Sequence, residues 1–380
     1  MKALMAILLA ATALVPSVQH AAADCSRAGA SDFDGDGQDD VAVGDPFADT
    51  VSIISAGKVI PVDVPAQKGD GLGWSVRLTK LNADGCADLV VGAPYADVNG
   101  TVDAGAVYLV YGGNAAPAKR LLAPEPQRDA HFGWSLAAKG DLVAIGAPYE
   151  DQAQLADAGS VYVRKGEGAL RRIQEDTEGV LGNAEVGDQF GWSLAFTSGN
   201  GLAVGVPYEN DDGPGRQVAS GKIDSGSITV VKDVLAPALT SVKWDSPTKT
   251  AGDRYGYAVA YSDRGGLAVS APGAGYVQLF DAAMKTGRTI RGVSGVMLAA
   301  AQDGRLAIGS ASGVQVTGQG EDRTIPAPGL SSVAFSGNKV FVGLPDAGRY
   351  GTVSSAGRND SALKPYEPAK GADFGASVAG

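Results

Sequence analysis

Short apolar runs alternate with tight polar turns along most of the chain. The clearest example is residues 132–149 (FGWSLAAKGDLVAIGAPY), in which two apolar runs flank the turn Lys139-Gly140-Asp141. Two short runs joined by Gly and Asp predict a β-hairpin rather than a helix. The second run ends in a small residue that is followed by Pro148.

The same hairpin pattern recurs along the sequence. Further copies, strong at first and weaker later, are found at residues 72–95, 190–208, 255–272, 296–311 and 333–345. A polar loop and a third apolar run follow several copies, as in residues 105–111 (GAVYLVY), and often a fourth run follows. Four strands with a period of roughly fifty residues predict one blade of a β-propeller.

The number of blades follows from the residue that ends each hairpin. This position is held by Pro46, Pro94, Pro148, Pro207, Pro272, Ala311 and Pro345. The pattern therefore predicts an all-β, seven-bladed β-propeller. The first blade lacks its own leading strand, and residues 373–380 (DFGASVAG) supply one at the other end of the chain. We expect this C-terminal strand to complete the N-terminal blade and close the ring, with Phe374 packed as Phe132 and Phe190 are.

The N-terminus has the composition of an export signal. Residues 1–23 contain Lys2, an apolar stretch and an Ala-x-Ala ending, which predict a secretory signal peptide rather than a membrane span. Residues 24–380 then form a single propeller domain, secreted or periplasmic and monomeric. Without Lys2, 30 basic residues face 42 acidic ones, a net charge of −12. Such an acidic surface repels phosphate backbones, so nucleic acid is excluded as a partner.

The chain has two cysteines, Cys25 and Cys86. In an exported protein they predict one disulfide, which closes about 61 residues. The alternative is a pair of unpaired buried thiols.

The strongest chemical motif is the acidic turn of residues 32–40 (DFDGDGQDD). Carboxylates at its first, third, fifth and ninth positions, Gly at the sixth and a backbone carbonyl at the seventh are typical of a Ca²⁺ loop. The predicted ligands are Asp32, Asp34, Asp36, Gln38 and Asp40. The alternative is a solvated acidic turn, in which these carboxylates would repel one another.

The second blade carries a degenerate copy of this turn at residues 80–88 (KLNADGCAD). Lys80 stands where the first Asp belongs, so we expect its ammonium to replace the metal through Asp84 or Asp88, and no ion there. The turns of the later blades are shortened. The sequence therefore predicts one calcium site.

These motifs together resemble a known family. FGWS, the DxDGDGxxD loop and VGAPY are similar to the FG-GAP repeats of the integrin alpha-subunit β-propeller and of related bacterial exported proteins. In that family calcium loops occupy one face and the loops after the GAP element bind ligands on the other. The chain departs from integrins because it has one intact calcium loop and no leg domains follow. The resemblance implies a secreted binding or cell-adhesion module rather than an integrin heterodimer.

The loops after the GAP element provide a candidate ligand face. Their Tyr and acidic residues, which suit a protein or carbohydrate ligand, are Tyr95, Asp97, Tyr149, Glu150, Asp151, Tyr208, Glu209 and Asp211. The alternative is that each Tyr covers a blade edge and each acid is a solvated loop residue. Trp74, Trp134 and Trp192 occupy one repeated position, which favours packing between blades over sugar stacking.

Propellers serve both as enzymes and as binding proteins, so the fold leaves the function open. Beyond the signal peptide the chain has one histidine, His131, at a position where the other repeats have Gly, Gln, Arg and Asp. A histidine-based mechanism is therefore disfavoured. No carboxylate pair is singled out by its spacing. We expect a non-catalytic binding module, with an extracellular polysaccharide- or phospholipid-degrading enzyme as the alternative.

Overall fold

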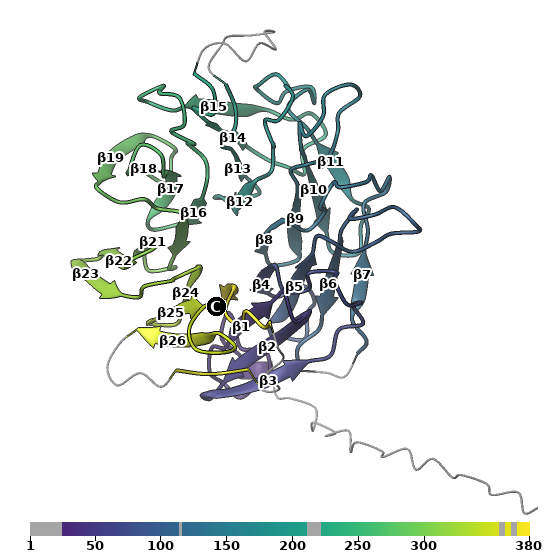
Figure 1. Cartoon of the computed structure of the whole chain (residues 1–380), viewed down its shortest axis with the longest axis vertical. Coiled ribbons are helices and arrows are strands. Elements are labelled where there is room, and N and C mark those ends of the chain that lie inside the picture. Colours follow the sequence, from purple (N-terminus) through teal and green to yellow (C-terminus); the bar gives the residue numbers. More distant parts are fainter. Residues whose placement is uncertain (1–24, 114–115, 211–221, 357–361, 366–370) are drawn as a thin grey trace, which may run out of the picture.

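The chain folds into a ring of seven antiparallel sheets around a central opening (Figure 1). A computed structural model describes residues 25–113, 116–210, 222–356, 362–365 and 371–380. In this part of the chain the single helical segment is the 3-10 turn η1 (Cys25–Arg27), and all other regular structure is strand. The signal peptide expected at residues 1–23 lies outside the described residues.

Each sheet is one blade. Blade 1 consists of β27 (Ser377–Ala379), β1 (Val41–Asp45), β2 (Thr50–Ser55) and β3 (Lys58–Val62). Blade 2 consists of β4 (Ser75–Thr79), β5 (Asp88–Ala93), β6 (Ala106–Val110) and β7 (Lys119–Leu121). Blade 3 consists of β8 (Ser135–Lys139), β9 (Leu142–Ala147), β10 (Ser160–Lys165) and β11 (Arg171–Ile173). Blade 4 consists of β12 (Ser193–Phe196), β13 (Leu202–Val206), β14 (Ser227–Val231) and β15 (Ser241–Asp245).

The remaining blades follow in chain order. Blade 5 consists of β16 (Val259–Ser262), β17 (Gly266–Ala271), β18 (Tyr276–Phe280) and β19 (Thr286–Arg291). Blade 6 consists of β20 (Met297–Ala300), β21 (Leu306–Ser310), β22 (Gly313–Gly318) and β23 (Glu321–Pro326). Blade 7 consists of β24 (Ser332–Ser336), β25 (Lys339–Leu344) and β26 (Thr352–Ala356), and an isolated bridge joins Val353 to Leu363. The expected seven-bladed propeller is confirmed.

The C-terminal strand closes the ring, as the sequence predicts. β27 pairs antiparallel with β1, with Val43 opposite Val378 and Ala42 opposite Ala379. Phe374 is 2% exposed and packs in a cluster drawn from blades 1 and 7. The first and last blades are therefore joined by both backbone hydrogen bonds and a shared apolar core.

The repeated motif residues form the junctions between neighbouring blades. Ser75 donates its hydroxyl hydrogen to the carbonyl of Gly133 in the next blade at 2.8 Å. A Cβ added to Gly92 would lie 2.1 Å from that same carbonyl oxygen, so only Gly fits there. Ser377 of the C-terminal strand makes the equivalent hydrogen bond to Gly73 at 2.6 Å. The Ser of FGWS makes this bond at several junctions, whereas blades 5 and 6 have Ala258 and Met297 at its position.

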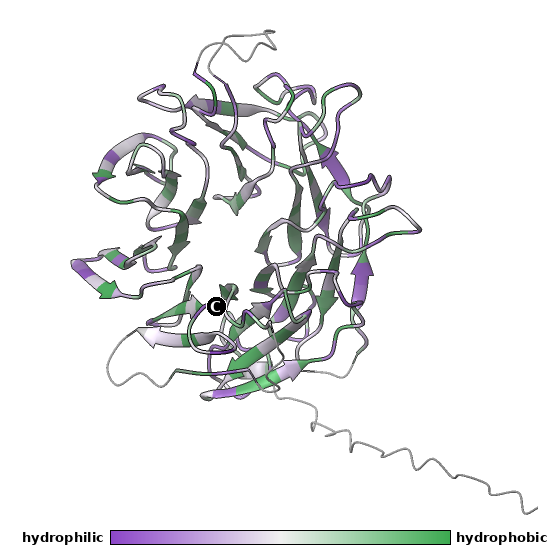
Figure 2. Cartoon of the chain, in the orientation of Figure 1, coloured by the Kyte–Doolittle hydropathy of each residue, from purple (hydrophilic) through white to green (hydrophobic). Residues whose placement is uncertain are grey.

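The core lies between blades and within their inner strands. All six residues of β9, the second strand of blade 3, are buried. By contrast, the residues of β19, the outermost strand of blade 5, are exposed or half-buried. Figure 2 shows the same gradient, with hydrophobic inner strands and hydrophilic outer strands such as β7 and β11. The strands nearest the axis therefore provide a rigid frame, and the loops at their ends are available for function.

The predicted disulfide is present. Cys25 and Cys86 are bonded, and their Cα atoms are 4.8 Å apart. The bond joins η1 to the turn before β5, and Gly113 packs on both sulfurs, since a Cβ there would lie 2.7 Å from each. The N-terminal segment is thereby fixed to blade 2.

Removing this bond should weaken the fold substantially. On the chain-entropy argument, a closed loop of 61 residues contributes about 4 kcal/mol to the free energy of unfolding. We expect Cys86→Ser to lower the midpoint of urea unfolding accordingly. Reductant should shift the midpoint of the wild type and leave that of the Cys25→Ser/Cys86→Ser double variant unchanged. Equal midpoints for oxidised and reduced wild-type protein would contradict this expectation.

Candidate functional site

The acidic turn before β1 brings three carboxylates together. Oxygens of Asp32, Asp34 and Asp36 lie within 4.8 Å of one another. Asp32 is buried, and its two oxygens accept hydrogen bonds from the amides of Gly35 at 2.7 Å and Gly37 at 2.8 Å. Both glycines have positive φ, 77° and 88°, so the tight turn depends on them. The turn holds its carboxylates around one point.

Asp40, which is not among the three carboxylates that lie within 4.8 Å of one another, has an open oxygen in the same turn. Its Oδ2 accepts hydrogen bonds from the amides of Phe33 at 2.8 Å and Asp34 at 3.4 Å, whereas its buried Oδ1 has no hydrogen-bond partner. Burial raises the pKa of Asp40 to about 7, against the backbone hydrogen bond from Phe33. Gln38 is exposed, and its amide donates to Asp36. A hard cation in this turn would satisfy the buried oxygen and offset the repulsion among the carboxylates.

The degenerate turn of blade 2 differs from the acidic turn in the partner of its last carboxylate. Asp88 binds the amides of Leu81 and Asn82 as Asp40 binds those of Phe33 and Asp34, but its second oxygen accepts a hydrogen bond from Gly112 at 3.0 Å. Lys80 donates to the carbonyl of Ala28 at 3.3 Å rather than to Asp84 or Asp88. The expected replacement of the metal by the ammonium is therefore wrong, and a backbone amide completes this turn instead.

The opposite face carries a continuous arc of aromatic rings. The acidic turn precedes the first residue of β1, whereas the aromatic loops follow the last residues of the equivalent strands β5, β9 and β13, so the two features lie on opposite faces. The aromatic ring that one blade contributes packs against the ring that the next blade contributes. We call this set the aromatic arc, and it consists of Trp74, Tyr95, His131, Trp134, Tyr149, Trp192, Tyr208 and Tyr257.

The geometry of the arc repeats from blade to blade. Ring centroids are 4.7 Å apart for Trp74 and Trp134, 5.1 Å for Trp134 and Trp192, and 5.5 Å for Trp192 and Tyr257. Within each blade the Tyr packs edge-on against the Trp, as Tyr149 does against Trp134 at 5.3 Å. Burial raises the pKa of Tyr149 to about 12, so its hydroxyl stays a neutral hydrogen-bond donor. The Trp rings pack between blades as expected, yet each remains partly exposed.

His131 belongs to this arc. Its ring lies between Tyr95 and Tyr149, with centroid distances of 4.8 and 5.1 Å, and its Nδ1 is 3.1 Å from the carbonyl oxygen of Pro94. Its φ is 53°, and the equivalent residues Gln189 and Arg254 also have positive φ. The position requires a left-handed backbone and makes few demands on the side chain, which explains the variety seen in the sequence. Nothing in this geometry pairs His131 with a nucleophile.

Two of the predicted ligand residues are turned away from the face. Glu150 is 1% exposed and accepts hydrogen bonds from Ser160 and Tyr162, each at 2.8 Å. Glu209 is 8% exposed and lies 2.6 Å from the ammonium of Lys243. Both acids follow a Tyr whose ring lies in the arc, so the next side chain points into the blade. Their placement on the loop rim is corrected accordingly.

The other predicted acids have mixed positions. Asp97 and Asp151 are exposed, and each accepts a hydrogen bond from an amide six residues later, Asp103 and Asp157 respectively. They stabilise equivalent loops of blades 2 and 3 while keeping an exposed carboxylate. Asp211 lies outside the described residues.

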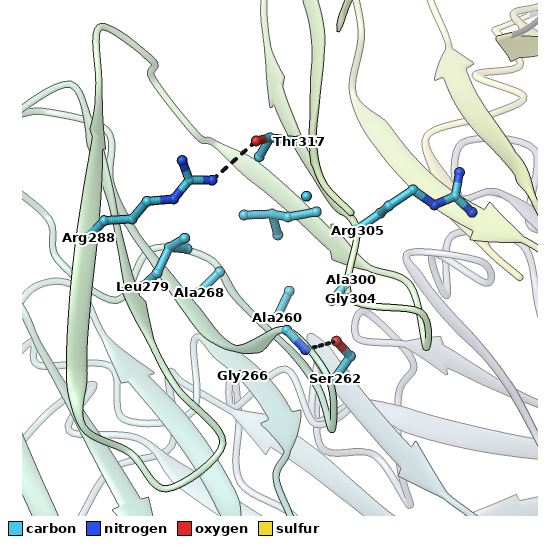
Figure 3. A pocket seen from close by; sticks show the side chains of 13 residues that line it. Ala260, Ser262, Gly266, Ala268, Leu279, Arg288, Ala300, Gly304, Arg305 and Thr317 are labelled. Atoms are coloured by element: carbon cyan, nitrogen blue, oxygen red, sulfur yellow. Dashed lines mark hydrogen bonds between the residues drawn. The ribbon is translucent and has the colours of Figure 1, made fainter. Parts of the chain in front are cut away.

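The described residues enclose three kinds of hollow. A central channel of about 860 Å³ is lined by the innermost strands, including those carrying Arg77, Lys139 and Asp303. A groove of about 630 Å³ lies beside Asp151 and Arg172 among several carboxylates and amides. Figure 3 shows a much smaller pocket between blades 5 and 6, of about 50 Å³, where Arg288 donates to Thr317. That pocket has room for water molecules and not for a large ligand.

Comparison with known families identifies the repeats. Two family models described as FG-GAP repeat match residues 72–110 and 118–164, which span blade 2 and much of blade 3. The chain is an FG-GAP repeat protein. FG-GAP repeats and a disulfide are typical of extracellular proteins, and no helix in the described residues is long and apolar enough to span a membrane. A search of curated protein sequences found no match.

Solved structures share the architecture of this FG-GAP repeat protein. Virginiamycin B lyase from Staphylococcus aureus aligns with a TM-score of 0.52 at 11% identity, over 78% of this chain and 84% of the lyase. A protein provisionally named 6-phosphogluconolactonase from Bacteroides uniformis aligns with a TM-score of 0.56 at 11% identity, over 89% and 98%. Apo AztD from Citrobacter koseri aligns with a TM-score of 0.50 at 12% identity, over 90% and 97%. At these identities the likeness is one of fold.

Proposed function

We propose that this FG-GAP repeat protein is an exported, calcium-binding propeller that uses its aromatic arc to bind a glycan or protein ligand, as an adhesion module does. The arc is the observation that carries the proposal. Three Trp rings and their Tyr partners present a partly exposed, rigid aromatic surface across neighbouring blades. Aromatic rings contribute large contact areas at low entropic cost, which is why they dominate binding surfaces.

The surroundings of the arc suit a polar ligand. Arg254 lies over the ring of Tyr208 at 5.4 Å, and the exposed Asp97 and Asp151 stand on the loops beside it. The groove next to Asp151 adds the amide of Gln152 and the guanidinium of Arg172. Carboxylates, amides and a guanidinium beside aromatic faces can hydrogen-bond the hydroxyls of a sugar or the polar groups of a peptide.

Calcium belongs to this proposal as a structural ion on the opposite face. Asp32, Asp34, Asp36 and Asp40 would hold it through carboxylate oxygens, and the carbonyl of Gln38 would add a further ligand. The buried, unpartnered Oδ1 of Asp40 supports the assignment, because the corresponding oxygen of Asp88 is satisfied by Gly112. The ion would neutralise the turn and fix the entry to β1. It would thus act on stability and not on the ligand directly.

An enzyme acting on polysaccharide or phospholipid remains the alternative. Such an enzyme would place two converging carboxylates at a deep pocket, at a separation of about 5 to 10 Å for glycoside hydrolysis. On the arc, Glu150 and Glu209 point into their blades and are engaged by Ser160 and Lys243 respectively. The structure therefore gives the binding function the stronger support.

The proposal can be tested with the tryptophans of the chain. Three of its four Trp residues lie in the arc, so binding of a ligand should change the intrinsic fluorescence. We expect a panel of purified glycans and extracellular proteins to contain a ligand that produces this change. Trp134→Ala, at the middle of the arc, should weaken its binding roughly tenfold, because a buried stacked ring contributes about 1 kcal/mol or more.

The matched control is Trp244→Phe. Trp244 packs on Phe280 away from the arc, with ring centroids 5.1 Å apart, so its replacement should leave affinity unchanged. Equal loss of affinity in both variants would show that the arc is not the binding surface. Release of soluble fragments from a polysaccharide or phospholipid by the wild type would favour the enzyme instead.

A further inference from the structure

Three buried carboxylates converge between blades 3 and 4, far from the acidic turn already described. Glu175 follows the last residue of β11, Asp188 precedes the FG element of blade 4, and Glu209 follows the Tyr208 loop. They are 1%, 0% and 8% exposed, and their oxygens lie within 4.8 Å of one another. Three segments that are distant in sequence therefore deliver one acidic centre to the interior.

Among the described residues, Lys243 brings a positive charge to the cluster. The ammonium of Lys243 lies 2.6 Å from Oε2 of Glu209 and 3.9 Å from Oε1 of Glu175. Burial lowers the pKa of Lys243, but the charges of Glu209 and Glu175 outweigh it and raise the pKa overall. Burial raises the pKa of Glu175 and raises that of Asp188 to about 8, so the interior holds these carboxylates ionised only if a cation joins them. Buried charge of this kind requires a partner.

The carboxylate oxygens of the cluster are open. Neither oxygen of Glu175 has a hydrogen-bond partner in the described part of the chain, and Oδ1 of Asp188 has none either. The other oxygen of Asp188 accepts the amide of Glu185 at 2.6 Å, which fixes the orientation of the side chain. The hydroxyl of Ser227 is also buried without a partner. Fully buried acceptors without donors are rare in folded proteins and indicate a missing ligand.

The preceding blade interface provides an internal comparison. Glu150 there corresponds to Glu209, because each is the third residue after the second strand of its blade. Glu150 is fully satisfied by Ser160, Tyr162 and Arg172. By the same strand registers, the counterparts of Glu175 and Asp188 are the buried residues Ala123 and Ala130. Glu175 thus has no acidic counterpart at the preceding interface, whereas the position of Asp188 also holds a buried Asp in other blades, namely Asp70 and Asp253.

The backbone closes over the cluster. A Cβ added to Gly182 would lie 2.2 Å from Oε1 of Glu175, so the loop before blade 4 passes directly against this carboxylate.

We propose that Glu175, Asp188 and Glu209 bind a calcium ion between blades 3 and 4. A divalent ion favours the ionised form of buried carboxylates, and carboxylate oxygens are the ligands that hard cations prefer. Oxygens bound to one Ca²⁺ at about 2.4 Å lie no more than about 5 Å apart, which matches the observed spacing. Lys243 remains on Glu209 and fixes that side chain. The ion joins the outer strand of blade 3 to the loops of blade 4.

Calcium binding to the purified protein by equilibrium dialysis tests this site separately from the acidic turn. In an Asp34→Ala background, which disables the turn, we expect one tightly bound calcium per chain. Adding Asp188→Asn should weaken that binding at least a hundredfold, whereas adding Glu150→Gln, at the matched position of blade 3, should leave it unchanged. Binding that is absent in Asp34→Ala, or unaffected by Asp188→Asn, would overturn the proposal.

Thermal unfolding of Glu175→Gln provides a second test that does not depend on Asp188. If a calcium ion neutralises the cluster, this variant should melt lower than the wild type in calcium and as high or higher in chelator. If protons neutralise the cluster, the variant should melt equally high or higher in both solutions, and that result would overturn the proposal. Circular dichroism of the variant confirms that it is folded before either comparison is made.

Discussion

A chain that lacks residues 373–380 is expected to lose its closed ring and to aggregate. The deletion removes β27, which pairs with β1, and takes Phe374 and Val378 out of the apolar cluster between blades 1 and 7. It also exposes the backbone edge of β1, and an unpaired edge is prone to pair with other chains. Loss of one buried Phe alone costs about 3 to 5 kcal/mol. Size-exclusion chromatography and thermal unfolding of the truncated chain measure both effects.

Point variants separate the effect of losing ring closure from the effect of merely shortening the chain. Phe374→Ala should lower the free energy of unfolding by about 3 to 4 kcal/mol, because the ring is buried. Phe47→Ala in the same blade should change it by less than about 0.5 kcal/mol, because Phe47 is 68% exposed. A truncated chain that stays monomeric with an unchanged melting temperature would contradict the closure of the ring by β27.

The fold was predictable because its determinants are local and repeated. The Ser of FGWS and the Gly of GAP have the same role at every junction where they occur, as the hydrogen bonds of Ser75 to Gly133 and of Ser377 to Gly73 show. Even the C-terminal strand could be placed, because Phe374 and Gly375 repeat the motif at the end of the chain. A repeat that recurs in order reveals its packing even when its later copies are weak.

The site was predictable only where it is local in sequence. The turn from Asp32 to Asp40 is a single stretch, so its spacing predicts the convergence of three of its carboxylates. The directions of Glu150 and Glu209 were not predictable, because a side chain one residue past a surface Tyr can face either way. The Lys243 that meets Glu209 is 34 residues further along the chain.

The buried cluster between blades 3 and 4 gave no signal in the sequence at all. Glu175, Asp188 and Glu209 lie on three separate loops, among many other acidic residues in a chain with 42. A comparison of aligned blades could have indicated Glu175, since Ala123 and Ser246 occupy its position in the blades on either side. An acid at a buried position that is otherwise small predicts a buried charge, and a buried charge requires a partner.

Calcium should stabilise the protein by binding to the acidic turn. Asp34→Ala should abolish the part of the calcium-dependent stabilisation that comes from this turn. At a hundredfold excess over its dissociation constant, an ion bound only by the folded state adds about 2.7 kcal/mol to the free energy of unfolding. The measurement is the shift in melting temperature between calcium and chelator. It is best made in a Glu175→Gln background, in which the turn is left as the one proposed calcium site.

The degenerate turn of blade 2 offers a matched control for this experiment. Asn82 corresponds to Asp34, and each side chain accepts a hydrogen bond from the amide two residues later, at 3.0 and 3.1 Å. Asn82→Ala therefore removes the same turn-stabilising bond without removing a carboxylate from the acidic turn. We expect the calcium-dependent shift to survive in Asn82→Ala and to vanish in Asp34→Ala. A shift that persists in Asp34→Ala would mean that the acidic turn is a solvated loop whose buried Asp40 is neutralised by a proton.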